Sequence, residues 1–214
     1  MNLGTLTDNW RQDAFDTGTP PLHSADNIAR WFSEAEEEAA IRKSLLRSAV
    51  EISLVAGDME ITLPAGVYEV RTARIVEAGQ TYWLDPSDRI EQDRLFRNWR
   101  DTTARPTAFI HDDTTLTLNR LVETASTLKL EAYRVPTAAM VDDADEPEIS
   151  AIHHRNLAGW VTYRAFSVPE TDFMDPARAA RGLADFTDYF GERPDANHQR
   201  NNNANRPHIV KAYP

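Results

Sequence analysis

The side chains most capable of chemistry in this sequence are carboxylates, and their densest run is Glu36, Glu37 and Glu38. Two carboxylates in different environments can hydrolyse a glycosidic bond, one as the acid and the other as nucleophile or base. The acid of such a pair needs burial to raise its pKa. The three glutamates lie on the polar side of an amphipathic helical pattern. We therefore interpret them as a solvated helix face.

Two histidine clusters could ligate a metal. His153 and His154 are adjacent, but neighbouring helical residues point about 100° apart, so the two rings cannot easily hold one ion. His111 precedes Asp112 and Asp113 in a predicted hairpin turn, where aspartate is favoured for backbone reasons, and further ligands at a recognisable spacing are missing. We interpret both clusters as structural and predict no metal and no cofactor.

The signature motifs of common enzyme classes are missing from the sequence. GxSxG, Walker, Rossmann and HExxH patterns do not occur. The chain has no cysteine, which excludes a disulfide framework and thiolate chemistry. We therefore predict that the protein is not an enzyme.

The composition describes an acidic chain with a basic end. The 214 residues carry a net charge of -11, and 41% of them are hydrophobic, enough for a core without any apolar run as long as a membrane span. The first residues lack the pattern of a secretory signal, so we expect a protein that works or assembles in the cytoplasm. Residues 193–214 carry +3, which leaves -14 for the other 192. General DNA binding through the whole surface is disfavoured.

Helical periodicity predicts four helices, at about residues 3–16, 25–47, 150–167 and 176–190. Ser24 or Asp26 is the expected N-cap of the second helix. Asp175 followed by Pro176 predicts the start of the fourth, and Gly191 its end.

Between about residues 50 and 135 the period falls to two, which predicts short strands. A hairpin is expected to turn at residues 111–114, and Leu128, Leu130 and Ala132 should share one face of a later strand. The charged stretch 79–103 is interpreted as an excursion between strands. We expect an α+β fold: a small helical bundle of about four helices with an antiparallel β insertion, all in one core of residues 1–192, and an extended C-terminal arm of residues 193–214.

Aromatic residues stand among charges in this excursion. Aromatic side chains beside arginine are typical of protein interfaces, although a small local core would use the same residues. The candidate protein interface consists of Tyr82, Trp83, Arg94, Phe96 and Trp99.

The arm, residues 193–214, has an asparagine-rich tract with too little apolar surface to offset the entropy of ordering. It ends in HIVKAY, an alternating pattern that could add to a sheet edge or fill a groove on a partner. A flexible terminus without a function is the alternative. The candidate partner contacts in the arm are Arg193, Arg200, Arg206, His208, Ile209, Val210, Lys211 and Tyr213.

Several stretches, in the same order along the chain, resemble those of a known family. They are SADNIARWFSEAEEEAAIRKSLL, ITLPAGVYEVRTARI, RPTAFIHDDTTLTL, LKLEAYRVP and EPEISAIHHRNLAGWVTYRAF, and the resemblance covers most of residues 3–190. The chain thereby resembles the head-to-tail adaptor proteins of tailed bacteriophages. It departs from the family pattern at Ser150 and His153, where proline and tyrosine are usual, and the arm matches nothing general.

The resemblance implies a non-enzymatic virion protein at the head–tail interface, assembled in the host cytoplasm and without a membrane. About twelve copies would form a ring beneath the portal protein, extend the channel through which DNA passes transiently, and offer a docking surface to a tail or nozzle protein. C-terminal arms in such rings commonly reach the portal. Two alternatives stay open: a tail-associated cell-wall hydrolase, and a head-completion or tail-tube protein at another level of the virion.

Overall fold

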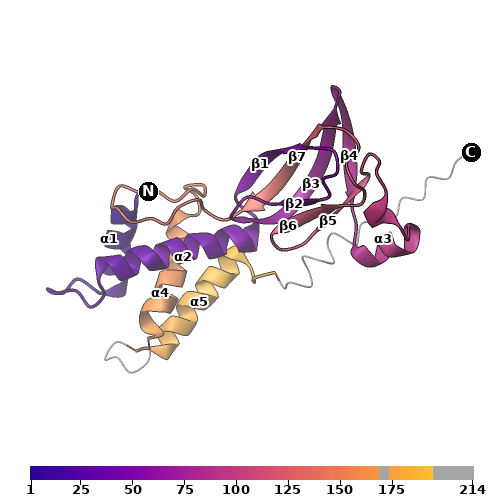
Figure 1. Ribbon diagram of the computed structural model, residues 1–214. Helices are drawn as coiled ribbons and strands as arrows, with labels where there is room; N and C mark the ends of the chain where they lie inside the picture. Colours follow the sequence, from indigo (N-terminus) through magenta and orange to yellow (C-terminus); the bar gives the residue numbers. More distant parts are fainter. Residues whose placement is uncertain (169–173, 195–214) are drawn as a thin grey trace, which may run out of the picture. The chain divides into compact units, whose positions relative to one another are not determined.

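The chain forms two compact units, which we describe separately (Figure 1). The computed structural model describes residues 1–168 and 174–194. The helical unit comprises Met1–Leu46 and Val135–Arg193, and the sheet unit comprises Arg47–Arg134.

The described part of the helical unit contains four α-helices: α1 Leu3–Ala14, α2 Ala25–Lys43, α4 Ala158–Phe166 and α5 Pro176–Phe190. Side-chain oxygens of Ser24 and Asp175 accept hydrogen bonds from the first turns of α2 and α5, and Gly191 ends α5, so these three predicted helix boundaries are confirmed. Helix α4 is shorter than expected because a 3-10 turn, His154–Leu157, precedes it. None of the helices in the described part of the chain combines the length and the apolar character needed to cross a membrane.

Helix α4 is the centre of this unit and packs against α1, α2 and α5. Its contact with α5 is unusually close, because a Cβ atom on Gly182 would lie 2.7 Å from the carbonyl oxygen of Gly159. Only glycine permits such an approach of two backbones. The core around this contact includes the fully buried side chains Trp10, Phe32, Leu157, Val161 and Phe186.

The sheet unit is a single curled sheet of seven strands, a half-barrel in Figure 1. The strands are β1 Arg47–Leu54, β2 Glu60–Thr62, β3 Val67–Glu77, β4 Gln80–Pro86, β5 Ala108–His111, β6 Thr115–Leu118 and β7 Ser126–Arg134. Their spatial order is β1-β7-β3-β4-β5-β6-β2. The inner face carries its own core, which includes Val70, Ile75, Phe109, Leu116 and Leu128.

Two local predictions in this unit are confirmed. Strands β5 and β6 pair as an antiparallel hairpin, closed by a hydrogen bond of 2.9 Å from the Asp112 N–H to the Thr115 carbonyl. Leu128, Leu130 and Ala132 of β7 are all buried on one face, as a period of two requires.

The expected architecture, a small helical bundle with an antiparallel β insertion, is wrong. The protein is a mixed α+β structure in which the sheet has a separate hydrophobic core, and the described residues contain five α-helices, not four. The additional helix, α3 Arg89–Leu95, lies between β4 and β5, which pair in parallel. Parallel neighbours need a long crossover connection, and the charged excursion provides it.

Candidate docking surfaces

A buried amide pair fixes α3 to the sheet. The Asn119 side-chain oxygen accepts hydrogen bonds from the N–H groups of Thr107 (2.9 Å) and Ala108 (3.1 Å), and its Nδ2 donates to Gln92 Oε1 at 3.3 Å. Asn119 and Gln92 are both buried. Because buried polar groups are costly unless they are paired, this arrangement holds α3 in one orientation.

Trp99 completes the inner side of the α3 region. Its ring is 2% exposed, and its Nε1 donates a hydrogen bond of 2.8 Å to Asp93 Oδ1. The Arg100 guanidinium lies 2.6 Å from the same oxygen. Hydrogen bonds from Arg100 and Trp99 hold the pKa of Asp93 below its usual value. Trp99 is therefore buried and does not form part of an exposed interface, which favours the alternative interpretation of the excursion as a small local core.

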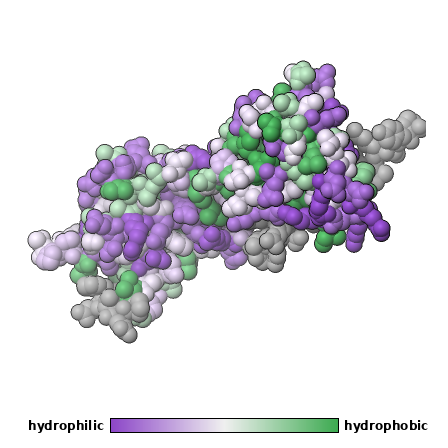
Figure 2. All heavy atoms as spheres, in the orientation of Figure 1, coloured by the Kyte–Doolittle hydropathy of each residue, from purple (hydrophilic) through white to green (hydrophobic). Residues whose placement is uncertain are grey.

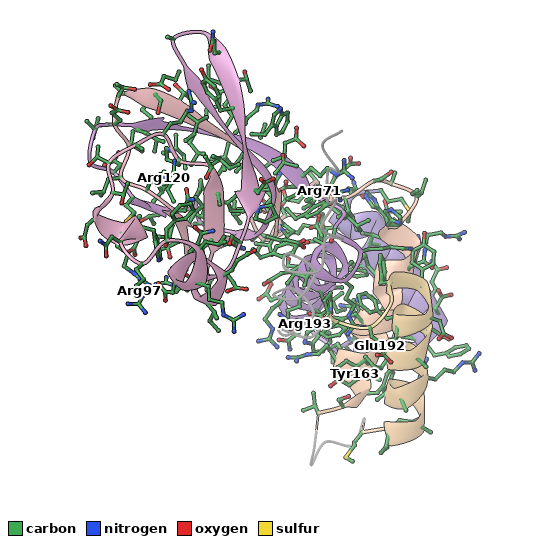
Figure 3. The ribbon with its side chains drawn as sticks, turned by 90° about the vertical axis from the view of Figure 1, so that its right-hand side faces the viewer. Arg71, Arg97, Arg120, Tyr163, Glu192 and Arg193 are labelled. Atoms are coloured by element: carbon green, nitrogen blue, oxygen red, sulfur yellow. The ribbon has the colours of Figure 1, made fainter. Side chains whose placement is uncertain are left out.

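The outer side of α3 combines apolar and basic side chains. Ile90 is 67% exposed and Phe96 is 52% exposed, and Leu95 is also exposed. Arg94 and Arg97 are exposed beside them, and Figure 3 shows Arg97 pointing outward. Figure 2 shows this region as largely hydrophilic with a few apolar side chains among the polar ones. We call Ile90, Arg94, Leu95, Phe96 and Arg97 the α3 surface.

Such a combination of exposed apolar and arginine side chains suits protein docking. The Arg120 guanidinium lies 5.5 Å from the centre of the Phe96 ring, at cation–π distance. Ile90 and Leu95 were missed in the sequence because they do not follow a helical stripe. The one sequence feature that could have indicated their exposure is their position within a run of charged residues.

Tyr82 and Trp83 do not lie on one surface. Successive strand residues point to opposite faces, and Tyr82 is paired with the buried Ile75 whereas Trp83 is paired with Arg74. Trp83 is 60% exposed, with the Arg74 guanidinium 5.3 Å from its ring centre. Of the five candidates in the excursion, only Arg94 and Phe96 therefore fall within the α3 surface.

In the helical unit, the last residues of α2 bind the C-terminal end of α5, from which the arm continues. Arg42 donates hydrogen bonds to Thr187 Oγ1 (3.1 Å) and to the Gly191 carbonyl (2.9 Å), and Lys43 Nζ donates to the Tyr189 carbonyl (2.8 Å). Cations at the C-terminal end of α5 also interact favourably with its macrodipole. These contacts give the arm a fixed starting point.

Arg193 is the one arm candidate that the structure describes. Its guanidinium lies 3.3 Å from Glu38, which also binds Arg42 at 2.9 Å, and Figure 3 places Arg193 just beyond α5. The other candidates, Arg200, Arg206, His208, Ile209, Val210, Lys211 and Tyr213, lie outside the described residues.

The interpretation of the three glutamates as a solvated face is wrong for two of them. Glu36 is 2% exposed and accepts a hydrogen bond of 3.1 Å from the N–H of Ile149. Glu38 is buried and binds Arg42, and only Glu37 is exposed. An amphipathic stripe predicts one buried face, whereas α2 also buries residues of its polar face. Both buried carboxylates serve the fold, because each has a partner from within the helical unit.

The paired histidines also make structural contacts. His154 is buried, with Nε2 2.9 Å from the Ile149 carbonyl, and His153 Nδ1 lies 3.0 Å from the Tyr189 hydroxyl. Burial, together with the nearby charges of Lys43 and His154, lowers the pKa of His153. Within residues 1–168 and 174–194, no three histidine or acidic side chains come together as a metal site.

These features, an exposed apolar and basic surface on one unit and a fixed base for a basic arm on the other, are typical of a protein that docks onto other proteins. A family model described as SU10 adaptor protein matches residues 1–210. The chain belongs to this family of bacteriophage adaptor proteins, so the resemblance seen in the sequence is confirmed. None of the curated proteins gives a significant match to the chain.

Membership of this family supports a structural role as a component of the virion. The docking features described above are compatible with that role.

Proposed function

We propose that the protein forms an oligomeric ring that joins the portal protein to the tail and extends the DNA channel. The observation that carries this proposal is the adaptor-family match over residues 1–210. An adaptor must contact two different partners. The chain offers two candidate contacts in separate units, the α3 surface in the sheet unit and the arm that starts from the helical unit.

The arm is the proposed contact with the portal protein. Arg42 fixes the starting point of the arm. The basic residues of the arm would attract an acidic surface of the portal protein, and the apolar tip would be buried against it. The contacts would come from the residues named in the sequence, Arg193, Arg200, Arg206, His208, Ile209, Val210, Lys211 and Tyr213.

The α3 surface is the proposed contact with a tail or nozzle protein. Burying Ile90, Leu95 and Phe96 against a partner would remove three exposed apolar side chains from water. Trp83 offers a further exposed aromatic contact on β4. This candidate interface would bind either the tail protein or the neighbouring copy in the ring.

A ring of about twelve copies follows from the resemblance to head-to-tail adaptors. The net charge of -11 suits a channel that DNA must pass without binding tightly. In this role the protein has no enzymatic activity, so the purified chain should not hydrolyse cell-wall glycans, nor should any Glu→Gln variant change that result.

The test is to mix the purified protein with its portal protein and examine the complex by cryo-electron microscopy. Deletion of residues 193–214 should abolish portal binding and leave binding of the tail protein unchanged. The matched variant, Ile90→Ser with Phe96→Ser, should retain portal binding and lose the tail protein. Portal binding by the truncated chain at the wild-type level would exclude the arm as the contact.

A further inference from the structure

The arginines of the helical unit fall into two groups. Five have a carboxylate partner within 4.0 Å: Arg11 with Asp16, Arg30 and Arg164 with Glu34, and Arg42 and Arg193 with Glu38. The other three are Arg155, Arg178 and Arg181, and no described carboxylate lies within that distance of them. Arg155 and Arg181 are exposed, and Arg178 is half-buried.

These three arginines line the same groove, which has a volume of about 530 Å³ and lies between α1, α4 and α5. Arg178 is held in place, because it donates a hydrogen bond of 3.2 Å to the Asp13 carbonyl and its guanidinium lies 4.2 Å from the centre of the Phe166 ring. The groove also contains the carboxylates of Asp13 and Asp185. With three arginines against two aspartates, its charged lining has a net charge of +1.

A positive groove is unusual in this part of the chain. Residues 1–46 and 135–193 contain nine basic and nineteen acidic residues, a net charge of -10. The guanidinium group binds carboxylates through two parallel hydrogen bonds. An acidic protein segment is thus the occupant whose chemistry fits.

The helical unit itself presents such a segment, the acidic loop of residues 142–146 with the sequence DDADE. The loop is ordered: Asp145 Oδ2 accepts hydrogen bonds from the N–H groups of Val141 (2.8 Å) and Asp142 (2.9 Å). Its backbone is also tied to α1, because the N–H of Gly4 donates to the Asp143 carbonyl at 3.0 Å. Asp142, Asp143 and Glu146 remain exposed.

Within the described residues, the acidic loop makes no ion pair with the groove arginines of its own chain. It is attached at Gly4, in the first turn of α1, whereas the groove is lined by Asp13 and Ala14 in the last turn. With a rise of about 1.5 Å per residue, the roughly nine helical residues between them span about 14 Å. The loop and the groove end at Asp13 and Ala14 are therefore separated within one chain, and a second copy can bring its loop to these arginines.

We propose that the acidic loop of one copy docks in the arginine groove of the next copy. This inference rests on the ring of the proposed function and names the contact that closes it. A contact between two different surfaces of the same chain is heterologous, and repetition of such a contact produces a ring when the rotation closes.

The experiment exchanges the charges of the two surfaces. The groove variant is Arg155→Glu with Arg181→Glu, and the loop variant is Asp142→Lys with Glu146→Lys. Each variant alone should lose ring formation on the portal protein, with at least a tenfold weaker association by analytical ultracentrifugation. An equimolar mixture should recover it, since the lysines introduced into one loop then face the glutamates introduced into the other groove, and the unchanged acidic loop faces the unchanged arginines. A control with two other exposed acids reversed, Asp8→Lys with Glu37→Lys, should assemble as the wild type does.

The outcomes separate this inference from the proposed function. Wild-type chains that never form a ring with the portal overturn both. If the groove variant forms rings as well as the wild type does, only the loop-and-groove contact is overturned. The same holds if both variants fold but their mixture stays dissociated. A groove variant that assembles normally but loses binding to a short DNA duplex would assign the groove to phosphate and also overturn the contact.

Discussion

Buried polar groups play different parts in the two units. In the helical unit they are mainly ionisable: Asp16, His23, Glu36, Glu38 and His154. In the sheet unit they are the neutral Gln92, Thr117 and Asn119. A buried charge is costly unless it is paired, so the helical unit depends on specific charged partners for its stability. The sheet unit instead uses hydrogen bonds between neutral amides to hold its exposed α3 surface.

Asp16 shows how much the helical unit depends on such a partner. Its carboxylate binds Arg11 at 2.6 Å and accepts hydrogen bonds from the N–H groups of Leu22 (2.5 Å) and His23 (3.3 Å). These contacts secure the turn between α1 and α2.

The largest effect is expected for Asp16→Ala. The substitution leaves the Arg11 guanidinium and two N–H groups without this acceptor, so the free energy of unfolding should fall by about 3 kcal/mol. Urea denaturation followed by circular dichroism measures it. Asp8→Ala, at an exposed position of α1, should change stability by no more than about 0.5 kcal/mol. Equal effects of the two substitutions would contradict the dependence on buried charge.

A smaller effect, confined to the sheet unit, is expected for Asn119→Ala. Gln92 and the N–H groups of Thr107 and Ala108 would each lose a hydrogen-bond partner, at a cost of about 1–3 kcal/mol. Hydrogen exchange should accelerate over residues 89–101, and tail-protein binding should weaken. The exposed Asn98, changed to alanine, is the control. Unchanged exchange in α3 would show that the amide pair does not hold this surface.

The smallest effect is a dependence of stability on pH. Burial and the nearby Arg11 lower the pKa of His23, and they outweigh Asp16, which raises it. Burial also lowers the pKa of His111. A histidine whose folded pKa is lowered binds more protons when unfolded. Stability should therefore fall as pH drops below about 6.5, the ordinary pKa of histidine.

His23 and His111 lie in different units, so single variants sharpen the comparison. His23→Phe should reduce the pH dependence of the helical unit, where the lowered pKa of His153 leaves a remainder, and His111→Gln should flatten that of the sheet unit. Urea denaturation between about pH 7.5 and about pH 5.5, which brackets the ordinary histidine pKa, measures both. A helical unit that loses as much stability in acid after the His23 substitution as before it would rule out this histidine as the cause.

Several elements could be predicted from the sequence because their causes are local. The cap of α2 at Ser24, the Asp175–Pro176 start of α5 and its end at Gly191 each depend on residues within one helical turn. The β5–β6 hairpin depends on four turn residues. The order of the family-like stretches along the chain also led to the adaptor family, which the match over residues 1–210 confirms.

Only the tertiary structure decided the rest, because burial depends on partners that are distant in the chain. Glu36 belongs to a polar helical pattern, yet it is buried by a contact with Ile149, 113 residues away. Trp99 and Phe96 have similar charged neighbours in sequence, but the first is buried and the second stays in water. The same holds for the architecture: strand alternation predicted short strands, while the pairing order that curls them around a separate core came from contacts across the whole unit.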